Sequence, residues 1–147
     1  MLLAVLALDQ LVKAIVMATI QRGARIELVF GLDLVHVRNK GVAFGALADG
    51  GAVVAALTAV ALVVLIVYFA LHSGGSWTWL ATGLLLGGAA GNLLDRARHG
   101  AVIDFVDFPL WPAFNLADAA ITCGVLLLVL GLDRDRRHDA RGDPSAA

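Results

Sequence analysis

Three long runs of apolar residues follow one another along this chain of 147 residues. The run 53–71 contains no charged residue, and the run 77–94 begins with Trp77 and Trp79. The third run, 114–132, carries a single carboxylate close to its start. Because ~20 mostly apolar residues are needed to cross the hydrocarbon layer of a membrane, each run predicts a membrane-spanning helix. The tryptophans suit an anchoring position at the membrane surface.

A fourth and weaker apolar segment occupies residues 1–20 and is interrupted by Asp9 and Lys13. It has no basic start and no small-residue cleavage site after a clean apolar core, so we expect a retained helix rather than a removed signal peptide. Asp9 and Lys13 lie four positions apart, and this spacing favours an ion pair on one face of a helix.

The segment 21–50 has a different character, because apolar residues such as Ile26, Leu28 and Phe30 alternate with polar ones and glycines interrupt the pattern. This alternation predicts short strands, and the apolar content argues against disorder. We expect an all-α membrane protein with four transmembrane helices and a small extramembrane β-cradle between helices 1 and 2. Residues 1–132 would form one domain, with a flexible tail at 133–147.

Glycines recur every four residues in the third span, at Gly83, Gly87 and Gly91. Residues four apart share one face of a helix, and a ridge of small side chains lets a second helix approach closely in lipid. The ridge therefore predicts a compact helix bundle.

The composition supports a membrane protein, since 60% of the residues are hydrophobic and the formal net charge is −1. A soluble domain of this size needs more polar surface, and the scattered basic residues indicate no nucleic-acid partner. One cysteine, Cys123, excludes an internal disulfide. Arginines and lysines lie on both sides of the predicted spans, so the charge pattern does not set the orientation.

Carboxylates gather at one edge of the predicted spans, although each costs roughly 2.5–3.5 kcal/mol inside a membrane. Asp95 ends the third span, where an acid opposes the helix dipole, so we expect a cationic partner for it in Arg96 or Arg98. Asp104 lies between apolar residues, and desolvation there would raise its pKa. Asp107 follows in the same connection.

Asn115 and Asp118 at the start of the fourth span have two interpretations that the spacing leaves open. Asn115 suits the N-cap of a helix, and Asp118 then falls in the first turn, where a carboxylate favours the dipole. Equally, Asp118 is an ionisable group in an apolar segment, which is a candidate functional residue.

Other hydrolytic chemistries find little support in the sequence. The serines lie outside the long apolar runs, Cys123 has no histidine nearby in sequence, and the four histidines lack metal-ligand spacing. If the protein is a hydrolase, its carboxylates are nearly the only catalytic groups left. Two close carboxylates share one proton and can activate a water molecule without a metal or cofactor.

Four stretches of the chain, taken together, resemble the lipoprotein signal peptidases, also called signal peptidase II. These stretches are DQLVK at 9–13, NKGVAFG at 39–45, GGAAGNLLDR at 87–96 running on to GAVIDF at 100–105, and FNLAD at 114–118. Their order and spacing extend the resemblance over nearly the whole chain.

The resemblance implies an aspartic endopeptidase that removes the signal peptide of diacylglyceryl-modified prolipoproteins just before the lipidated cysteine. The catalytic pair would be Asp104 and Asp118. The positions that would bind substrate or support the site are Asn39, Gly41, Asn92, Arg96 and Asn115. The positions that would hold the site together are Asp9, Lys13 and Asp95. The resemblance implies no metal and no cofactor, and inhibition by globomycin is expected.

The resemblance also implies a location in the bacterial cytoplasmic (inner) membrane. The chain would cross it several times with both termini in the cytoplasm, and the segment 21–50 and the active site would lie at the outer, periplasmic face. The expected partners are the prolipoprotein and membrane lipid, with no nucleic acid, and we expect a monomer.

Two interpretations compete with a peptidase. A small four-span transporter or proton conductor could use Asp95, Asp104 and Asp118 as relay sites. It would not explain the polar segment 21–50, and no repeat-like symmetry relates the two halves of the chain. A structural membrane adaptor would use its acids only for pairing with bases, so neutral variants of Asp104 and Asp118 would keep its function.

Overall fold

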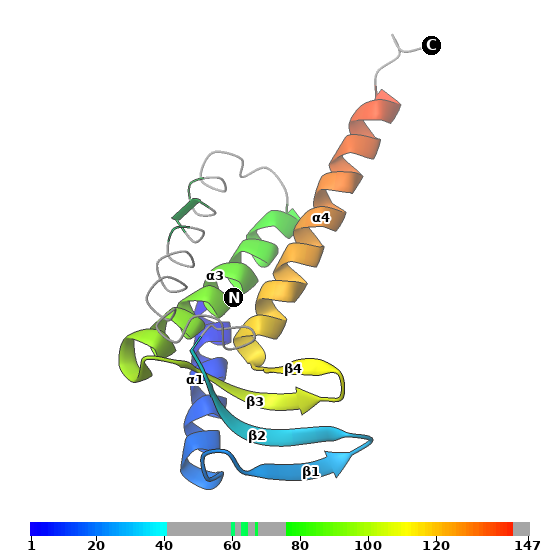
Figure 1. Cartoon of the computed structure of the whole chain (residues 1–147). Coiled ribbons are helices and arrows are strands. Elements are labelled where there is room, and N and C mark those ends of the chain that lie inside the picture. The colour runs from blue at the N-terminus through cyan, green and yellow to red at the C-terminus, as the bar shows by residue number, and fades with distance from the viewer. Residues whose placement is uncertain (41–59, 61–62, 65–66, 68–75, 143–147) are drawn as a thin grey trace.

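The computed structural model describes residues 1–40, 60, 63–64, 67 and 76–142, and the segments 1–40 and 76–142 form three helices and one sheet (Figure 1). The helices are α1 (Leu2–Thr19), α3 (Ser76–His99) and α4 (Leu116–Gly142). The strands are β1 (Arg25–Val29), β2 (Leu32–Asn39), β3 (Val102–Phe108) and β4 (Trp111–Phe114).

Helix α3 packs against both α1 and α4, and its glycines allow the close approach. A Cβ atom added at Gly87 would lie 2.8 Å from the carbonyl oxygen of Leu2, and one at Gly91 would lie 2.6 Å from Oδ2 of Asp9. On another side of α3, a Cβ at Gly88 would lie 2.4 Å from the carbonyl oxygen of Ala117. The close packing predicted from the Gly83, Gly87 and Gly91 ridge is confirmed, with α1 as the partner helix.

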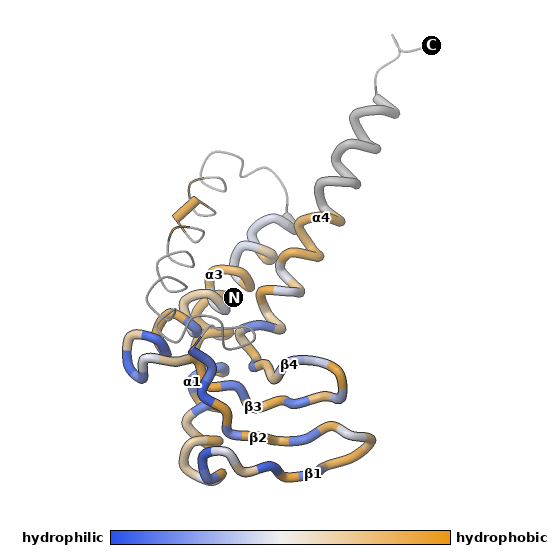
Figure 2. The backbone as a smooth tube through the Cα atoms, viewed as in Figure 1, coloured by the Kyte–Doolittle hydropathy of each residue, from blue (hydrophilic) through white to orange (hydrophobic). Residues whose placement is uncertain are grey.

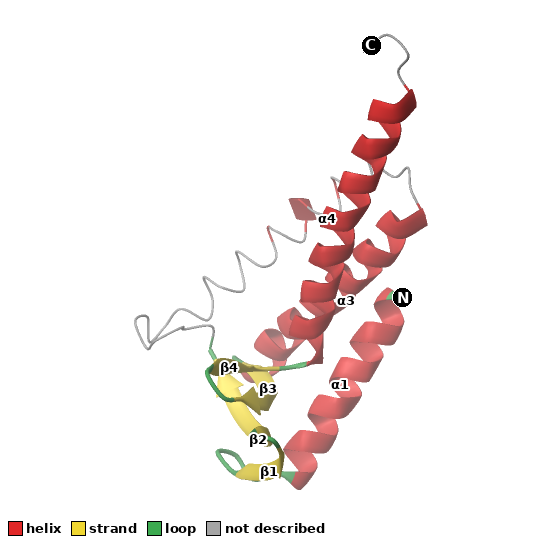
Figure 3. Cartoon of the chain, turned by 90° about the vertical axis from the view of Figure 1, so that its right-hand side faces the viewer, coloured by secondary structure: helices red, strands yellow, loops and turns green. Residues whose placement is uncertain are grey.

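The sheet is antiparallel with the strand order β1-β2-β3-β4, so two hairpins pair through β2 and β3. It lies at the end of the bundle where α1 and α3 end and α4 begins, and it projects sideways from the helices (Figures 1 and 3). Val37 pairs with Asp104 across the central strands, and this register brings the end of β2 next to Asp104.

The predicted fold class is wrong, because the described residues are not all-α and their sheet is not confined to the segment between the first two helices. Half of its strands come from residues 102–114, which we expected to be a short connection between spans. The alternation in 102–108 is typical of a strand, but its pairing partner β2 lies far away in sequence.

The predicted spans correspond only in part to the helices observed. Helix α1 matches the prediction closely, whereas α3 extends to His99 and α4 continues to Gly142, into the predicted tail. The expected span 53–71 lies largely outside the described residues. Among the described helices, α1 alone is long and apolar enough to cross a membrane by itself, and in α4 a shorter apolar part covers Leu116–Leu130. Polar residues such as Asn92 and Asp95 interrupt the apolar character of α3.

Several charged side chains are buried, whereas many large apolar side chains of the helices are exposed. Figure 2 shows the apolar residues along the first part of α4. The largest fully buried side chains are Lys13, Ile103, Asn115, Asp9, Asp95 and Asp104. Leu3, on α1, is 75% exposed, and Val129 and Leu130 on α4 are also exposed. Such a distribution is unfavourable in water and suits a chain surrounded by lipid, where ionisable groups face the protein interior. A small apolar core of Val16, Ile20 and Phe105 joins α1 to the sheet.

Candidate active site

Asp104 lies on β3 in a run of five buried residues, 101–105, and its own side chain is almost completely enclosed. Its Oδ1 accepts a hydrogen bond from Nδ2 of Asn115 at 2.7 Å, and its Oδ2 accepts one from Nδ2 of Asn39 at 2.9 Å. Burial, reinforced by the nearby charge of Asp118, raises the pKa of Asp104 to about 6, although both hydrogen bonds oppose the shift. Asp104 can therefore carry a proton near neutral pH.

Asp118 lies in the first turn of α4, where it and Asn115 cap the helix reciprocally. The backbone N–H of Asp118 donates to Oδ1 of Asn115 at 3.0 Å, and the backbone N–H of Asn115 donates to Oδ2 of Asp118 at 3.2 Å. The predicted capping is thus confirmed. It involves only Oδ2 of Asp118, and Oδ1 accepts a hydrogen bond from Nδ2 of Asn92 at 2.8 Å.

Two asparagines connect the two carboxyl groups. Nδ2 of Asn115 donates both to Asp104 and, at 3.2 Å, to Oδ1 of Asn92. The same Asn92 oxygen accepts a hydrogen bond from the ammonium group of Lys13 at 3.1 Å. An ammonium group only donates hydrogen bonds, so the oxygen of Asn92 must face Lys13 and its NH₂ group must face Asp118. Both carboxyl groups therefore face amide donors.

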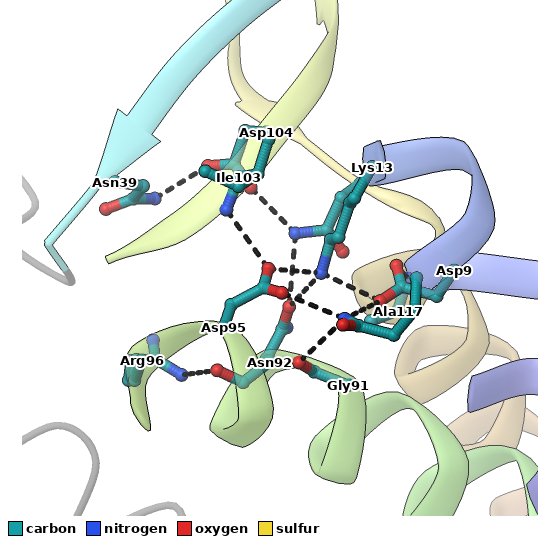
Figure 4. Close-up of polar contacts among 12 residues, drawn as sticks. Asp9, Lys13, Asn39, Gly91, Asn92, Asp95, Arg96, Ile103, Asp104 and Ala117 are labelled. Atoms are coloured by element: carbon teal, nitrogen blue, oxygen red, sulfur yellow. Dashed lines mark hydrogen bonds and ion pairs between the residues drawn. The ribbon is translucent and has the colours of Figure 1, made fainter. Parts of the chain in front are cut away.

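Lys13 is buried at the centre of this network (Figure 4). Its Nζ atom lies 2.8 Å from Oδ2 of Asp9 and 2.7 Å from Oδ2 of Asp95, in addition to the bond to Asn92. These three acceptors use all three donors of the ammonium group. The predicted Asp9–Lys13 pair is confirmed. The cationic partner of Asp95 is Lys13, so the prediction of Arg96 or Arg98 is wrong; Lys13 comes from another helix, which sequence spacing does not reveal.

The two acids paired with Lys13 also fix the backbone of neighbouring elements. Oδ1 of Asp9 accepts a hydrogen bond from the backbone N–H of Ala117 at 3.0 Å, at the start of α4. Oδ2 of Asp95 accepts one from the backbone N–H of Ile103 at 3.2 Å, next to Asp104. Asp104 and Asp118 thus each directly follow a residue whose backbone N–H is bound to an acid of the cluster formed by Lys13, Asp9 and Asp95, here called the Lys13 cluster.

Gln10 is a member of the network that sequence reasoning missed. Its Nε2 atom donates to Oδ1 of Asp95 at 2.8 Å and contacts the carbonyl oxygen of Gly91 at 3.4 Å. A polar residue beside Asp9 in an apolar segment was the signal available in the sequence.

Arg96 and Gly41 are the predicted site residues that remain, and Asp107 is a further carboxylate in the same stretch of sequence as Asp104. Arg96 is half-buried, its Nη1 contacts the carbonyl oxygen of Asn92 at 3.5 Å, and its buried Nε has no hydrogen-bond partner among the described residues. Gly41 lies outside the described residues. Asp107, although close to Asp104 in sequence, pairs with Arg25 on the exposed part of the sheet.

A cavity of about 470 Å³ opens beside Asp118 between β4 and the first turns of α4. Its walls include Trp111, Phe114 and Cys123. Thr122 also lines the cavity, but its hydroxyl is already used in a hydrogen bond to the carbonyl oxygen of Asp118 at 2.9 Å. The cavity is therefore mainly apolar, and its volume falls in the range of ~300–1,000 Å³ typical of small-molecule sites. The sequence alone did not indicate these wall residues.

Comparisons with known proteins agree on one family. The family model for signal peptidase (SPase) II matches residues 1–133. A lipoprotein signal peptidase of Halothermothrix orenii is 40% identical over 131 residues, covering 88% of this chain and 90% of the relative. One from Syntrophomonas wolfei is 43% identical over 140 residues and covers 93% of each chain.

Solved structures show the same relationship. A bacterial membrane enzyme solved by the in meso method superimposes with a TM-score of 0.82 at 30% identity, covering 99% of this chain and 91% of that one. A second one gives a TM-score of 0.79 at 33% identity, with 89% and 88% covered. The chain therefore belongs to the signal peptidase II family and is a bacterial membrane peptidase. This membership decides against the transporter and adaptor interpretations.

Proposed function

We propose that this protein is an intramembrane aspartic endopeptidase that removes the signal peptide from diacylglyceryl-modified prolipoproteins just before the lipidated cysteine. Asp104 and Asp118 are its catalytic pair. The observation that carries this proposal is that both carboxyl groups accept hydrogen bonds from the same residue, Asn115, with Asp104 fully buried. Relatives named lipoprotein signal peptidase support the substrate class.

The chemistry follows from one proton shared by two neighbouring carboxyl groups, because the charge of each opposes ionisation of the other. The ionised carboxylate takes a proton from a water molecule, which attacks the carbonyl carbon of the scissile amide. The protonated carboxyl donates a hydrogen bond to the carbonyl oxygen. The leaving amine then receives a proton from the pair, which titrates as a unit.

The residues around the pair offer hydrogen bonds to an extended peptide. Asn39 ends β2 beside Asp104, and Arg96 has a buried Nε without a partner among the described residues. We assign these side chains, together with Asn92, Asn115 and Gly41, to substrate binding or support of the site. Lys13, Asp9 and Asp95 are structural supports. The apolar cavity beside Asp118 accommodates an apolar part of the substrate next to the scissile bond.

The enzyme works in the cytoplasmic membrane as a multi-pass monomer, with the active site near the outer face. The polar interior and the exposed leucines of α1 support burial of the helices in lipid. Globomycin is expected to inhibit it by occupying the site around Asp104 and Asp118.

Purified protein in detergent, incubated with a prolipoprotein before and after diacylglyceryl modification, tests this proposal. Mass spectrometry of the products should place the cut directly before the modified cysteine, and globomycin should suppress it. Cleavage of both forms at equal rates would exclude specificity for the lipid, and a cut elsewhere would exclude the proposed activity.

A further inference from the structure

The two hairpins of the sheet carry large apolar side chains at their outer ends. Phe30, in the turn between β1 and β2, and Leu110, in the turn between β3 and β4, are fully exposed. Val29, Phe108 and Trp111 beside them are also about half exposed or more. Figure 2 shows this apolar character at the outer ends of both hairpins. Exposing such a group of side chains to water is unfavourable and marks an interaction surface.

The backbone conformation at both turns is unfavourable for large apolar residues. Phe30 has a φ of 52° and Leu110 a φ of 67°, in the left-handed region that bulky side chains rarely adopt. Glycine or asparagine would satisfy these turns at lower cost. Strained positions of this kind persist mainly where the side chain has a function.

The two turns form one surface rather than two. A Cβ atom added at Gly31 would lie 2.7 Å from Cγ of Pro109, so the tip of the first hairpin packs directly on the second. Arg25 pairs with both Asp33 and Asp107, which ties β1, β2 and β3 together behind the tips. The tips are therefore held in a fixed relative position.

The position of the sheet identifies the partner. It lies at the end of the helix bundle and projects sideways, so its tips lie beside the bundle at the level where the helices end (Figures 1 and 3). Helix α1 is about 27 Å long at ~1.5 Å per residue, close to the ~30 Å of a bilayer core. A sheet at the end of such a helix reaches the interface between hydrocarbon and water.

We propose that Val29, Phe30, Phe108, Leu110 and Trp111, here called the hairpin-tip anchor, insert into the lipid surface of the membrane that holds the helices. Tryptophan and phenylalanine favour this interfacial layer. Trp111 also lines the cavity beside Asp118, so the anchor holds that cavity at the lipid surface. The inference rests on membership of a membrane-enzyme family and goes beyond the proposed peptidase chemistry.

Trp111 can report on the environment of the hairpin tips by its fluorescence, because only two other tryptophans, Trp77 and Trp79, need to be replaced. A Trp77→Phe/Trp79→Phe variant, reconstituted into phosphatidylcholine vesicles, leaves Trp111 as the sole source of tryptophan fluorescence. Phosphatidylcholine brominated on the acyl chains near the headgroups should quench most of this fluorescence, and iodide added to the water should quench little. Strong quenching by iodide with none by brominated lipid would overturn the proposal.

A second substitution tests whether the tips cause the insertion. In the same single-tryptophan background, Phe30→Ser/Leu110→Ser should move the Trp111 emission to longer wavelength and reduce quenching by brominated lipid. Ile26→Ser, which removes an exposed apolar residue of β1 away from the tip, should leave both unchanged. If lipid quenching is absent and the emission depends on protein concentration, the anchor binds a second copy instead and the proposal is wrong. None of these readouts requires peptidase activity, so the anchor and the proposed function can fail separately.

Discussion

Asn39 shows how single hydrogen bonds adjust the acidity of the proposed catalytic pair. Its amide donates to Oδ2 of Asp104 at 2.9 Å and so favours the ionised form of that carboxyl, against the larger effect of burial. The balance brings the pKa of Asp104 to about 6. The pair needs one proton, so activity should fall as the pH rises through the pKa at which this proton is lost.

We therefore expect Asn39→Ala to move the alkaline limb of the profile of kcat/KM against pH to higher pH. Removing a donor that stabilises the carboxylate raises the pKa of Asp104, so the proton is retained longer. Weaker substrate binding would lower the whole profile without moving its midpoint. Asp107→Asn is the matched control, and a midpoint that stays in place or moves to lower pH in Asn39→Ala would contradict this explanation.

At the scale of single residues, the sequence predicted which residues belong to the site better than it predicted the contacts between them. The capping of Asp118 by Asn115 was predictable because it depends on a spacing of three residues. The bond between Asn92 and Asp118 was not, because it joins two helices whose relative rotation is set by tertiary packing. The same holds for Gln10 and Asp95.

Among the elements, the contact between α1 and α3 requires glycine at several positions, and Gly91 is the one that lies against a buried carboxylate. A Cβ at Gly91 would lie 2.6 Å from Oδ2 of Asp9, which pairs with Lys13, while Oδ1 of the same carboxylate accepts a hydrogen bond from the N–H of Ala117. A Cβ at Gly83 would instead meet the side chain of Met1 at 2.7 Å, at the very end of α1. The two positions share a face but differ in how easily the neighbour can move.

Gly91→Ala is expected to destabilise the protein by about 1–3 kcal/mol, the usual range for overpacking, and to lower activity by displacing Asp9 and the start of α4. Gly83→Ala is expected to have a smaller effect on both, because the end of a helix can shift. Thermal unfolding in detergent and the cleavage assay measure these effects. Equal losses in the two variants would show that the helix contact is uniform and that the carboxylate has no special role.

The strands show which secondary-structure elements could be predicted from the sequence and which could not. The alternation in 21–50 predicted strands, and β1 and β2 confirm them. The alternation in 102–108 was visible too, but its partner β2 lies more than sixty residues away, and local pattern contains no information on such pairing. The sheet therefore turned out larger than expected.

For the molecule as a whole, the Lys13 cluster holds the helices and the sheet together, as an apolar core does in a soluble protein. One ammonium group joins α1 to α3, and its two acidic partners continue to the backbone of α4 and β3. In lipid the apolar residues of the helices gain little by packing together, so buried polar contacts decide how the helices associate. The sequence predicted one pair of this cluster, and tertiary structure supplied the rest.

Lys13→Met is expected to cost about 3–5 kcal/mol, because it leaves the buried carboxylates of Asp9 and Asp95 without their cation. Arg25→Ala also removes two ion pairs, but the side chain of Arg25 is 56% exposed and water screens both pairs in part, so we expect a smaller loss of stability than for Lys13→Met. Denaturation in mild detergent can compare the two variants. Similar stability losses would contradict the central role given to the buried cluster.

The most direct test of the account is cleavage of a diacylglyceryl-modified prolipoprotein by wild type, Asp104→Asn, Asp118→Asn and Asp107→Asn. Asp107 is a suitable control, since it lies on the same strand as Asp104 yet pairs with Arg25 away from the site. We predict that wild type and Asp107→Asn cleave the substrate, whereas folded Asp104→Asn and Asp118→Asn do not cleave it measurably. Cleavage that survives in either of the last two variants would contradict the assignment of Asp104 and Asp118 as the catalytic pair.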